Sequence, residues 1–231
     1  MHALDNPGVG SERGTAAPLS LRATSAHLLR RFAALRAAQG VPHDEPFGVL
    51  GVSMGGMLAL DIAAHSAAGP AHCGVVAAVI VNSSGSSAPL WRRFTPLAVR
   101  AMLRGALLPR RAREAAMLRV TVRDETRAAQ LLPAFCALAE ARPLPLRTLM
   151  SQLLAIVRWR APAAVPVPVL VARSLGDELC HPECSAALAR SLASPLRSHP
   201  SAGHDLPAED PAWLASTVRA WLDAGMPRHA D

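Results

Sequence analysis

The chain has 231 residues, of which 51% are hydrophobic and 18% are charged, and its formal net charge is +7. This length and composition predict one α/β domain with a sizeable core and exclude a disordered chain. No apolar run approaches the roughly 18 residues that a membrane-spanning helix needs, so we expect no stable membrane insertion. The first residues, "MHALDNPGVGSERG", lack the basic and apolar regions of a signal peptide, which predicts a cytoplasmic protein.

The positive charge comes from arginine alone, because the chain has 24 basic residues and none of them is lysine. Tyrosine is absent too and alanine is abundant, a bias that is typical of a GC-rich genome. Aromatic residues make up only 3% of the chain, which leaves little to stack on bases. We therefore expect no nucleic-acid partner.

Four cysteines, Cys73, Cys136, Cys180 and Cys184, lack the dense spacing of a disulfide framework. Cys180 and Cys184, with His181 between them, are candidate metal ligands, but no second ligand pair accompanies them. We interpret them as small side chains at the start of a helix, packed against the core. The sequence thus predicts no metal and no cofactor.

The first half of the chain alternates between helical and strand patterns. Residues 19–39 predict an amphipathic helix that ends at Gly40. Residues 46–53, "PFGVLGVS", form a short Val-rich apolar run that is typical of a buried strand. A helix over residues 57–68 and a second buried strand over residues 74–84 follow. Together they predict a strand–helix–strand unit of a parallel sheet.

Arginines recur among Leu, Ala and Met over residues 86–160, and prolines divide this stretch into short helices. We interpret it as a helical cap inserted into the domain. Strand patterns return at residues 165–174 and 195–200, with helices predicted at 182–193 and, as one final helix, at 207–225. Strands and helices alternate around a single insertion, so the sequence predicts one domain over residues 1–231.

The stretch Gly51-Val52-Ser53-Met54-Gly55 matches G-x-S-x-G at a predicted strand-to-helix junction. The turn there is so sharp that side chains at Gly51 and Gly55 are expected to collide with neighbouring backbone. Ser53 then projects above the N-terminus of the following helix, where developing negative charge is favoured. The alternative is a tight turn whose glycines serve only packing.

A serine nucleophile needs a base, and the base needs an acid that holds its tautomer. His204 lies on the loop after the short strand at 195–200, and Asp177 lies in the turn after the strand at 165–174. Glu178 follows Asp177, but adjacent residues of a turn point in different directions, so we prefer Asp177. Asp205 is expected to cap a turn or face solvent. Core or surface roles suit His199 and His65, and the other histidines do not follow a strand in this way: His2, His27, His43, His72, His181 and His229. The carboxyl ends of parallel strands lie at one edge of the sheet, so residues that follow different strands can meet there. We therefore predict a catalytic triad of Ser53, Asp177 and His204.

In this order of Ser, acid and His, the sequence resembles the α/β-hydrolase superfamily over nearly its whole length. The resemblance rests on "LDNPGVGSE", "GVSMGG", "SLGDELCHPECS" and "SAGHDLPAEDPAWLA". It implies a serine hydrolase that cleaves a carboxylic ester or thioester of a small acyl substrate through an acyl-enzyme. The N–H of Met54 would supply one oxyanion donor. A serine nucleophile argues against the dehalogenase and epoxide-hydrolase branches of this superfamily, which use aspartate.

The resemblance departs from the family pattern at the front. Members have three strands before the segment "HALDNPGVG", and the third ends in a loop that gives the second oxyanion donor. We expect the natural start to lie upstream of Met1. The alternative is a truncated, catalytically impaired protein that acts at most as a binding scaffold.

Seven arginines occur among Leu and Met early in the predicted cap: Arg92, Arg93, Arg100, Arg104, Arg110, Arg111 and Arg113. They could contact an acidic acyl carrier protein or an anionic membrane surface. A solvated cap face in an Arg-rich chain explains the same pattern, and we favour that interpretation.

Overall fold

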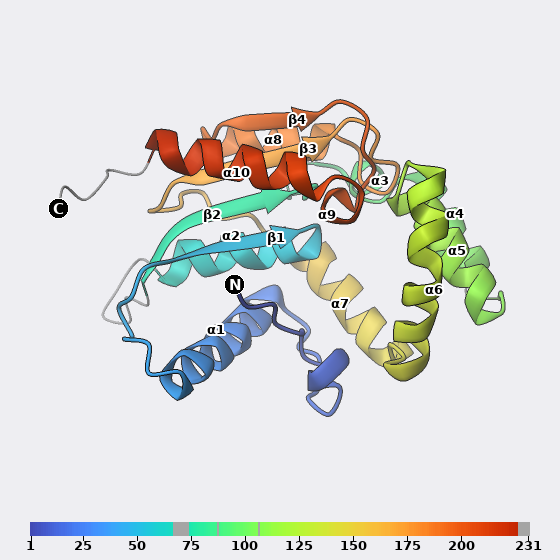
Figure 1. Ribbon diagram of the computed structural model, residues 1–231, viewed down its shortest axis with the longest axis horizontal. Helices are drawn as coiled ribbons and strands as arrows, with labels where there is room; N and C mark the ends of the chain where they lie inside the picture. Colours follow the sequence, from blue (N-terminus) through green and yellow to red (C-terminus); the bar gives the residue numbers. More distant parts are fainter. Residues whose placement is uncertain (67–73, 87, 106, 226–231) are drawn as a thin grey trace.

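A computed structural model describes residues 1–66, 74–86, 88–105 and 107–225. Its centre is a four-stranded parallel sheet in the order β1-β2-β3-β4 (Figure 1). The strands are β1 (Phe47–Val52), β2 (Val75–Val81), β3 (Val169–Ser174) and β4 (Leu196–His199). The predicted α/β fold, a mostly parallel sheet flanked by helices, is confirmed.

Helices cover both faces of this sheet because successive residues of a strand point to opposite sides. Ile80 of β2 faces a core shared with α1 (Leu21–Ala38), α2 (Met54–Ser66) and α8 (Glu183–Ser191). Its neighbours Val79 and Val81 face a second core with α9 (Leu206–Glu209) and α10 (Pro211–Gly225). Burial on both faces explains why β2 reads as a continuous apolar run.

Several element boundaries differ from the sequence prediction, and the two largest differences occur at prolines. The predicted final helix is divided into α9 and α10 at Asp210, whose φ of −138° and ψ of 74° are not helical. A residue before proline avoids the helical region, and Pro211 follows Asp210. The predicted strand at residues 165–174 begins only at Val169, because Pro166 and Pro168 have no N–H for a ladder bond. Residues 67 and 68 of the helix predicted at 57–68 lie outside the described residues.

Five helices lie between β2 and β3: α3 (Leu90–Arg93), α4 (Pro96–Gly105), α5 (Arg110–Thr121), α6 (Glu125–Ala141) and α7 (Leu146–Arg158). We call them the helical insertion. Figure 1 shows α4, α5 and α6 beyond the carboxyl ends of the strands, with α7 returning towards the sheet. No helix in the described part of the chain is long and apolar enough to cross a membrane.

Candidate active site

Ser53 lies in the turn between β1 and α2, with a positive φ of 55° that is unusual for a residue with a side chain. Its N–H donates to the carbonyl of Val81 at 2.8 Å. Its own carbonyl accepts from the N–H of Gly56 at 3.0 Å and from Ser83 Oγ at 2.8 Å. The carboxyl end of β2 therefore holds the backbone of this turn in its strained conformation.

The glycines around Ser53 have different roles. A Cβ added to Gly51 would lie 1.9 Å from the carbonyl oxygen of Gly55, so this position tolerates no side chain. We expected a side chain at Gly55 to collide with backbone as well. That prediction is wrong, because a Cβ at Gly55 meets nothing within 4 Å. The glycine that packs closely is Gly56, where a Cβ would lie 2.9 Å from Cβ of Ser83 and 3.0 Å from Ile80.

These contacts predict opposite effects of one added methyl group. We expect Gly51→Ala to cost about 3 kcal/mol or more in unfolding free energy, because backbone has to move. Gly55→Ala lies in the first turn of α2 and should gain up to about 1 kcal/mol. Urea unfolding of both variants measures the difference. Equal losses at the two positions would contradict this account of the turn.

Met54 begins α2, directly after Ser53. None of the hydrogen bonds among the described residues uses its N–H. A free N–H at a helix N-terminus, reinforced by the helix dipole, favours an oxyanion next to Ser53. Met54 therefore stays a candidate oxyanion donor.

Asp177 and His204 lie together, each after a different strand. His204 Nδ1 is 2.7 Å from Asp177 Oδ2, and both side chains are buried. The other oxygen of Asp177, Oδ1, accepts from the N–H groups of Leu179 and Cys180, each at 2.9 Å. These bonds fix the carboxylate, which in turn selects the imidazole tautomer with the proton on Nδ1. Nε2 is then left as the basic nitrogen.

The neighbouring acids make other contacts. Glu178 pairs with Arg123 at the surface. Asp205 precedes α9, where its backbone carbonyl accepts from the N–H of Ala208, and burial raises the pKa of its carboxyl. These contacts leave Asp177 as the acid at the His204 ring.

Two further histidines have structural partners. Nδ1 of His199 accepts from the N–H of Ala202 at 2.8 Å, and its Nε2 lies 3.3 Å from Asp210 Oδ2. His65 Nδ1 lies 2.8 Å from the carbonyl of Asp61, one turn earlier in α2. Both contacts agree with the core or surface roles predicted for them.

In the described part of the chain, no hydrogen bond joins Ser53 Oγ to His204. Nucleophile–base bonds in empty sites are often long and close around substrate. What links the two residues here is the end of β2, through Asn82.

Asn82 is the site residue that the sequence analysis missed. It is 2% exposed, with a positive φ of 44°. Its Nδ2 donates to the carbonyls of His204 at 2.8 Å and Gly203 at 3.2 Å, and to Ser174 Oγ at 3.0 Å. Its Oδ1 accepts from the N–H of Ser174 at 2.7 Å. The only signal in the sequence is a polar residue that directly follows a fully apolar strand.

Asn82 therefore connects the end of β2, which is bonded to the backbone of Ser53, to the end of β3 and to the loop that carries His204. We expect Asn82→Gly to lose about 2–4 kcal/mol of unfolding free energy, since several buried polar groups lose their partner. Asn82→Ala should lose about 1 kcal/mol more, because alanine is strained at a positive φ. Both variants should lower kcat more than they raise KM. Urea unfolding and steady-state kinetics measure these effects, and an unchanged kcat in a folded variant would remove Asn82 from the site.

The start of the helical insertion is hydrogen-bonded to residues 175–181, the turn that carries Asp177, which we call the acid turn. The N–H of His181 donates to the carbonyl of Arg92 at 2.9 Å, and the N–H of Thr95 donates to the carbonyl of Leu179 at 3.0 Å. Buried Arg93 donates to the carbonyl of Ile156 at 2.6 Å, and burial lowers the pKa of its guanidinium. The start and the end of the insertion are thus fixed to each other and to the turn that carries Asp177.

Cys180 and Cys184 are buried and pack with Ala88, as expected of small side chains near a helix start. Cys73 lies outside the described residues. Within the residues that the structure describes, no three His, Cys, Asp or Glu side chains gather in a group that could hold a metal ion.

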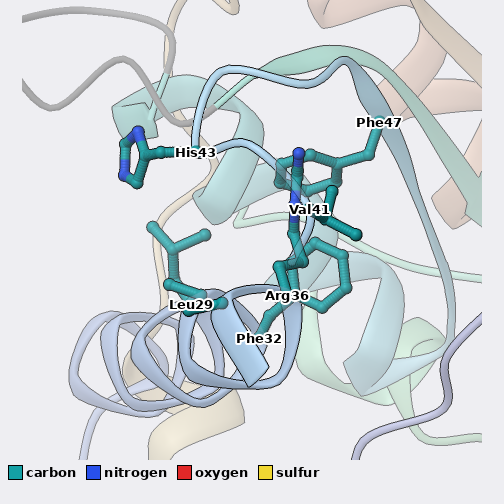
Figure 2. A pocket seen from close by; sticks show the side chains of 8 residues that line it. Leu29, Phe32, Arg36, Val41, His43 and Phe47 are labelled. Carbon is teal, nitrogen blue, oxygen red and sulfur yellow. The ribbon is translucent and has the colours of Figure 1, made fainter. Parts of the chain in front are cut away.

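A cavity of about 120 Å³ lies at the opposite end of β1, between this strand and α1 (Figure 2). Arg36 lies over the rings of Phe32 and Phe47 there, at 5.6 and 5.0 Å from their centroids. Its guanidinium donates to the carbonyls of Pro42 at 2.7 Å and Glu45 at 2.6 Å. Arg36 thus holds the loop that leads into β1, and the cavity is separate from Ser53.

Comparisons with known proteins agree with this fold. The sequence model of a family described as "Alpha/beta hydrolase family" matches residues 1–217. The fold is similar to an enol-lactonase from Burkholderia xenovorans LB400, with TM-score 0.70 and 21% identity over 95% of this chain and 79% of that one. It is also similar to a hydrolase from Pseudomonas aeruginosa PA01 (TM-score 0.69, 21% identity, 94% and 77% covered). An esterase, RhEst1, from Rhodococcus sp. ECU1013 has TM-score 0.61 and 22% identity, with 95% and 78% covered. A comparison with curated proteins found no significant match to the sequence.

Proposed function

The chain belongs to the α/β hydrolase family, and we propose that it is a serine hydrolase that cleaves a carboxylic ester or thioester of a small acyl substrate. Family membership supports a hydrolase. The observation that carries the finer proposal is the buried Asp177–His204 pair, at the same edge of the sheet as the strained turn at Ser53. The cytoplasmic location stays a prediction, and a contact with an acyl carrier protein stays the alternative that the sequence did not favour.

In the proposed reaction, Ser53 Oγ attacks the acyl carbon while His204 Nε2 takes the hydroxyl proton. Asp177 keeps the proton on Nδ1 and stabilises the imidazolium that forms. The N–H of Met54 donates to the oxyanion of the tetrahedral intermediate. When the intermediate collapses, His204 gives its proton to the leaving oxygen or sulfur, and the acyl group stays on Ser53.

Water then completes the cycle. His204 Nε2 takes a proton from a water molecule as the water oxygen attacks the acyl-enzyme. When the second intermediate collapses, the bond from the acyl carbon to Ser53 Oγ breaks, His204 returns the proton to Oγ, and the carboxylic acid leaves. The chemistry needs no metal or cofactor. The helical insertion lies over this end of the sheet, and we propose that it acts as a cap that selects the acyl group.

A fluorophosphonate probe tests the proposal. We expect the purified protein to gain one probe adduct, and peptide mass spectrometry to place it on Ser53 rather than on nearby Ser83 or Ser84. Esters of p-nitrophenol with acyl chains of increasing length, and matched thioesters, would then define the substrate class. No adduct under conditions where a known esterase reacts would favour the alternative, a catalytically impaired binding scaffold.

A further inference from the structure

The segment of residues 90–113 has an unusual composition. It contains seven arginines and no aspartate or glutamate. It begins with α3, includes α4 and ends in the first turn of α5. We call it the basic segment. The charge of this segment alone fits a solvated surface, which is the interpretation favoured from the sequence. The structure shows in addition which of its side chains are exposed.

Large apolar side chains of the basic segment face solvent. Trp91 is 71% exposed, Leu103 is 68% exposed and Leu107 is 89% exposed. The other exposed members of this set are Leu90, Leu97, Val99 and Leu108. An amphipathic surface helix normally turns such residues towards the core. Here the buried residues of α4 are small ones, Ala98 and Gly105.

Exposed cations lie among these apolar side chains. Arg92, Arg100, Arg104 and Arg111 are exposed and form no ion pair within the described residues. On α4 the two kinds alternate along the exposed side, since Leu97 and Val99 are followed by Arg100, and Leu103 by Arg104. Figure 1 shows α4 at the end of the molecule remote from the C-terminus, packed on α5.

We propose that the basic segment is a docking surface for an anionic lipid bilayer. A bilayer interface accepts Leu and Trp side chains at the acyl boundary, while arginines bind lipid phosphates. Nucleic acid would leave the leucines exposed to water. The surface lies on helices that are too short to span, so the contact is peripheral and agrees with the expectation of no stable insertion.

The docking surface is far from the site in sequence but is linked to it by backbone hydrogen bonds. α3 is bonded to the acid turn through the carbonyl of Arg92, and α4 starts directly after Thr95, which is bonded to Leu179. Docking would therefore orient the insertion-covered end of the sheet towards the membrane. This inference does not depend on the proposed reaction, because the lipid contact uses none of its groups.

Vesicle co-sedimentation tests the proposal. We expect the full chain to bind vesicles of phosphatidylcholine with 30% phosphatidylglycerol (about one lipid in three) far better than pure phosphatidylcholine vesicles, and binding to weaken with salt. Arg100→Gln/Arg104→Gln should lower the partition coefficient about 30-fold. Leu103→Ala/Leu107→Ala should lower it about tenfold or more. Ser53→Ala should bind like the wild type, which separates this result from any failure of the proposed function.

Two matched variants serve as controls. Arg197→Gln/Arg219→Gln removes two exposed arginines, one on β4 and one on α10, and Leu146→Ala/Met150→Ala removes two exposed apolar side chains from α7. Both should retain binding. Equal losses in test and control variants, equal binding to neutral and anionic vesicles, or no binding to either would overturn the proposal. Self-association in light scattering that only the basic-segment variants abolish would assign the surface to a second copy instead, and would overturn it too.

Discussion

We expect Ser53→Ala to lower kcat for a p-nitrophenyl ester by about 10⁴–10⁶-fold, because the acyl-enzyme can no longer form. The loss should fall on kcat, while KM changes little. Stability should be almost unchanged, since Ser53 Oγ forms no hydrogen bond within the described residues and the backbone bonds to Val81 and Ser83 remain. Steady-state kinetics and thermal unfolding on the same preparations measure both effects.

Ser216→Ala is a suitable control, because Ser216 lies on the exposed side of α10 and its hydroxyl donates only to the carbonyl of Trp213. It should retain full activity. Ser53→Gly adds a second comparison, since glycine relieves the positive φ and should raise the unfolding free energy by about 1 kcal/mol. Activity that survives in both Ser53 variants would assign the reaction to another residue.

Asp177→Asn has the second largest expected effect, a loss of about 10⁴-fold in kcat. The asparagine oxygen can still accept from the N–H groups of Leu179 and Cys180, so the turn should keep its conformation. Its NH₂ group then faces Nδ1 of His204 and selects the tautomer with the proton on Nε2. His204 in that tautomer cannot take the proton of Ser53.

Glu178→Gln tests whether the loss of kcat is specific to the carboxylate at position 177. Glu178 is the adjacent carboxylate, and its partner is Arg123 rather than His204. We expect its variant to retain kcat within about threefold and to lose at most about 1 kcal/mol of stability. A loss in Glu178→Gln as large as that in Asp177→Asn would mean that the acid has been assigned to the wrong residue.

The parts of the site that the sequence could predict follow from the strand order along the chain. Parallel strands place their carboxyl ends at one edge, so residues that follow different strands were expected to meet there. Asp177 and His204 do meet, at 2.7 Å. The apolar run of β2 was also recognisable, since a strand buried on both faces has no polar residues.

What sequence reasoning missed depends on side-chain neighbours. Gly51 and Gly55 are equivalent in the motif, but only Gly51 faces backbone that a Cβ would strike. Asn82 looks like an ordinary strand-end residue until its amide is placed against Ser174 and His204. The leucines of the basic segment, such as Leu103, are of a type that is usually buried, and only the structure shows that they are exposed.

The way in which the helical insertion is attached determines how much its length and sequence can change. Its two ends are fixed near each other by Arg93 and the carbonyl of Ile156, so the helices between them close a loop whose ends are already held. The entropic cost of such a loop grows slowly, by about 0.6 kcal/mol for each doubling of its length. The junction of α5 and α6 is bonded to the loop that carries His204, because the N–H of Asp205 donates to the carbonyl of Thr121 at 2.8 Å. Helix α4 and the far part of α6 are therefore the parts that can lengthen, shorten or be exchanged at little cost to the sheet. The edge of the sheet that carries Asp177 and His204 can stay constant while the exposed part of the insertion diversifies.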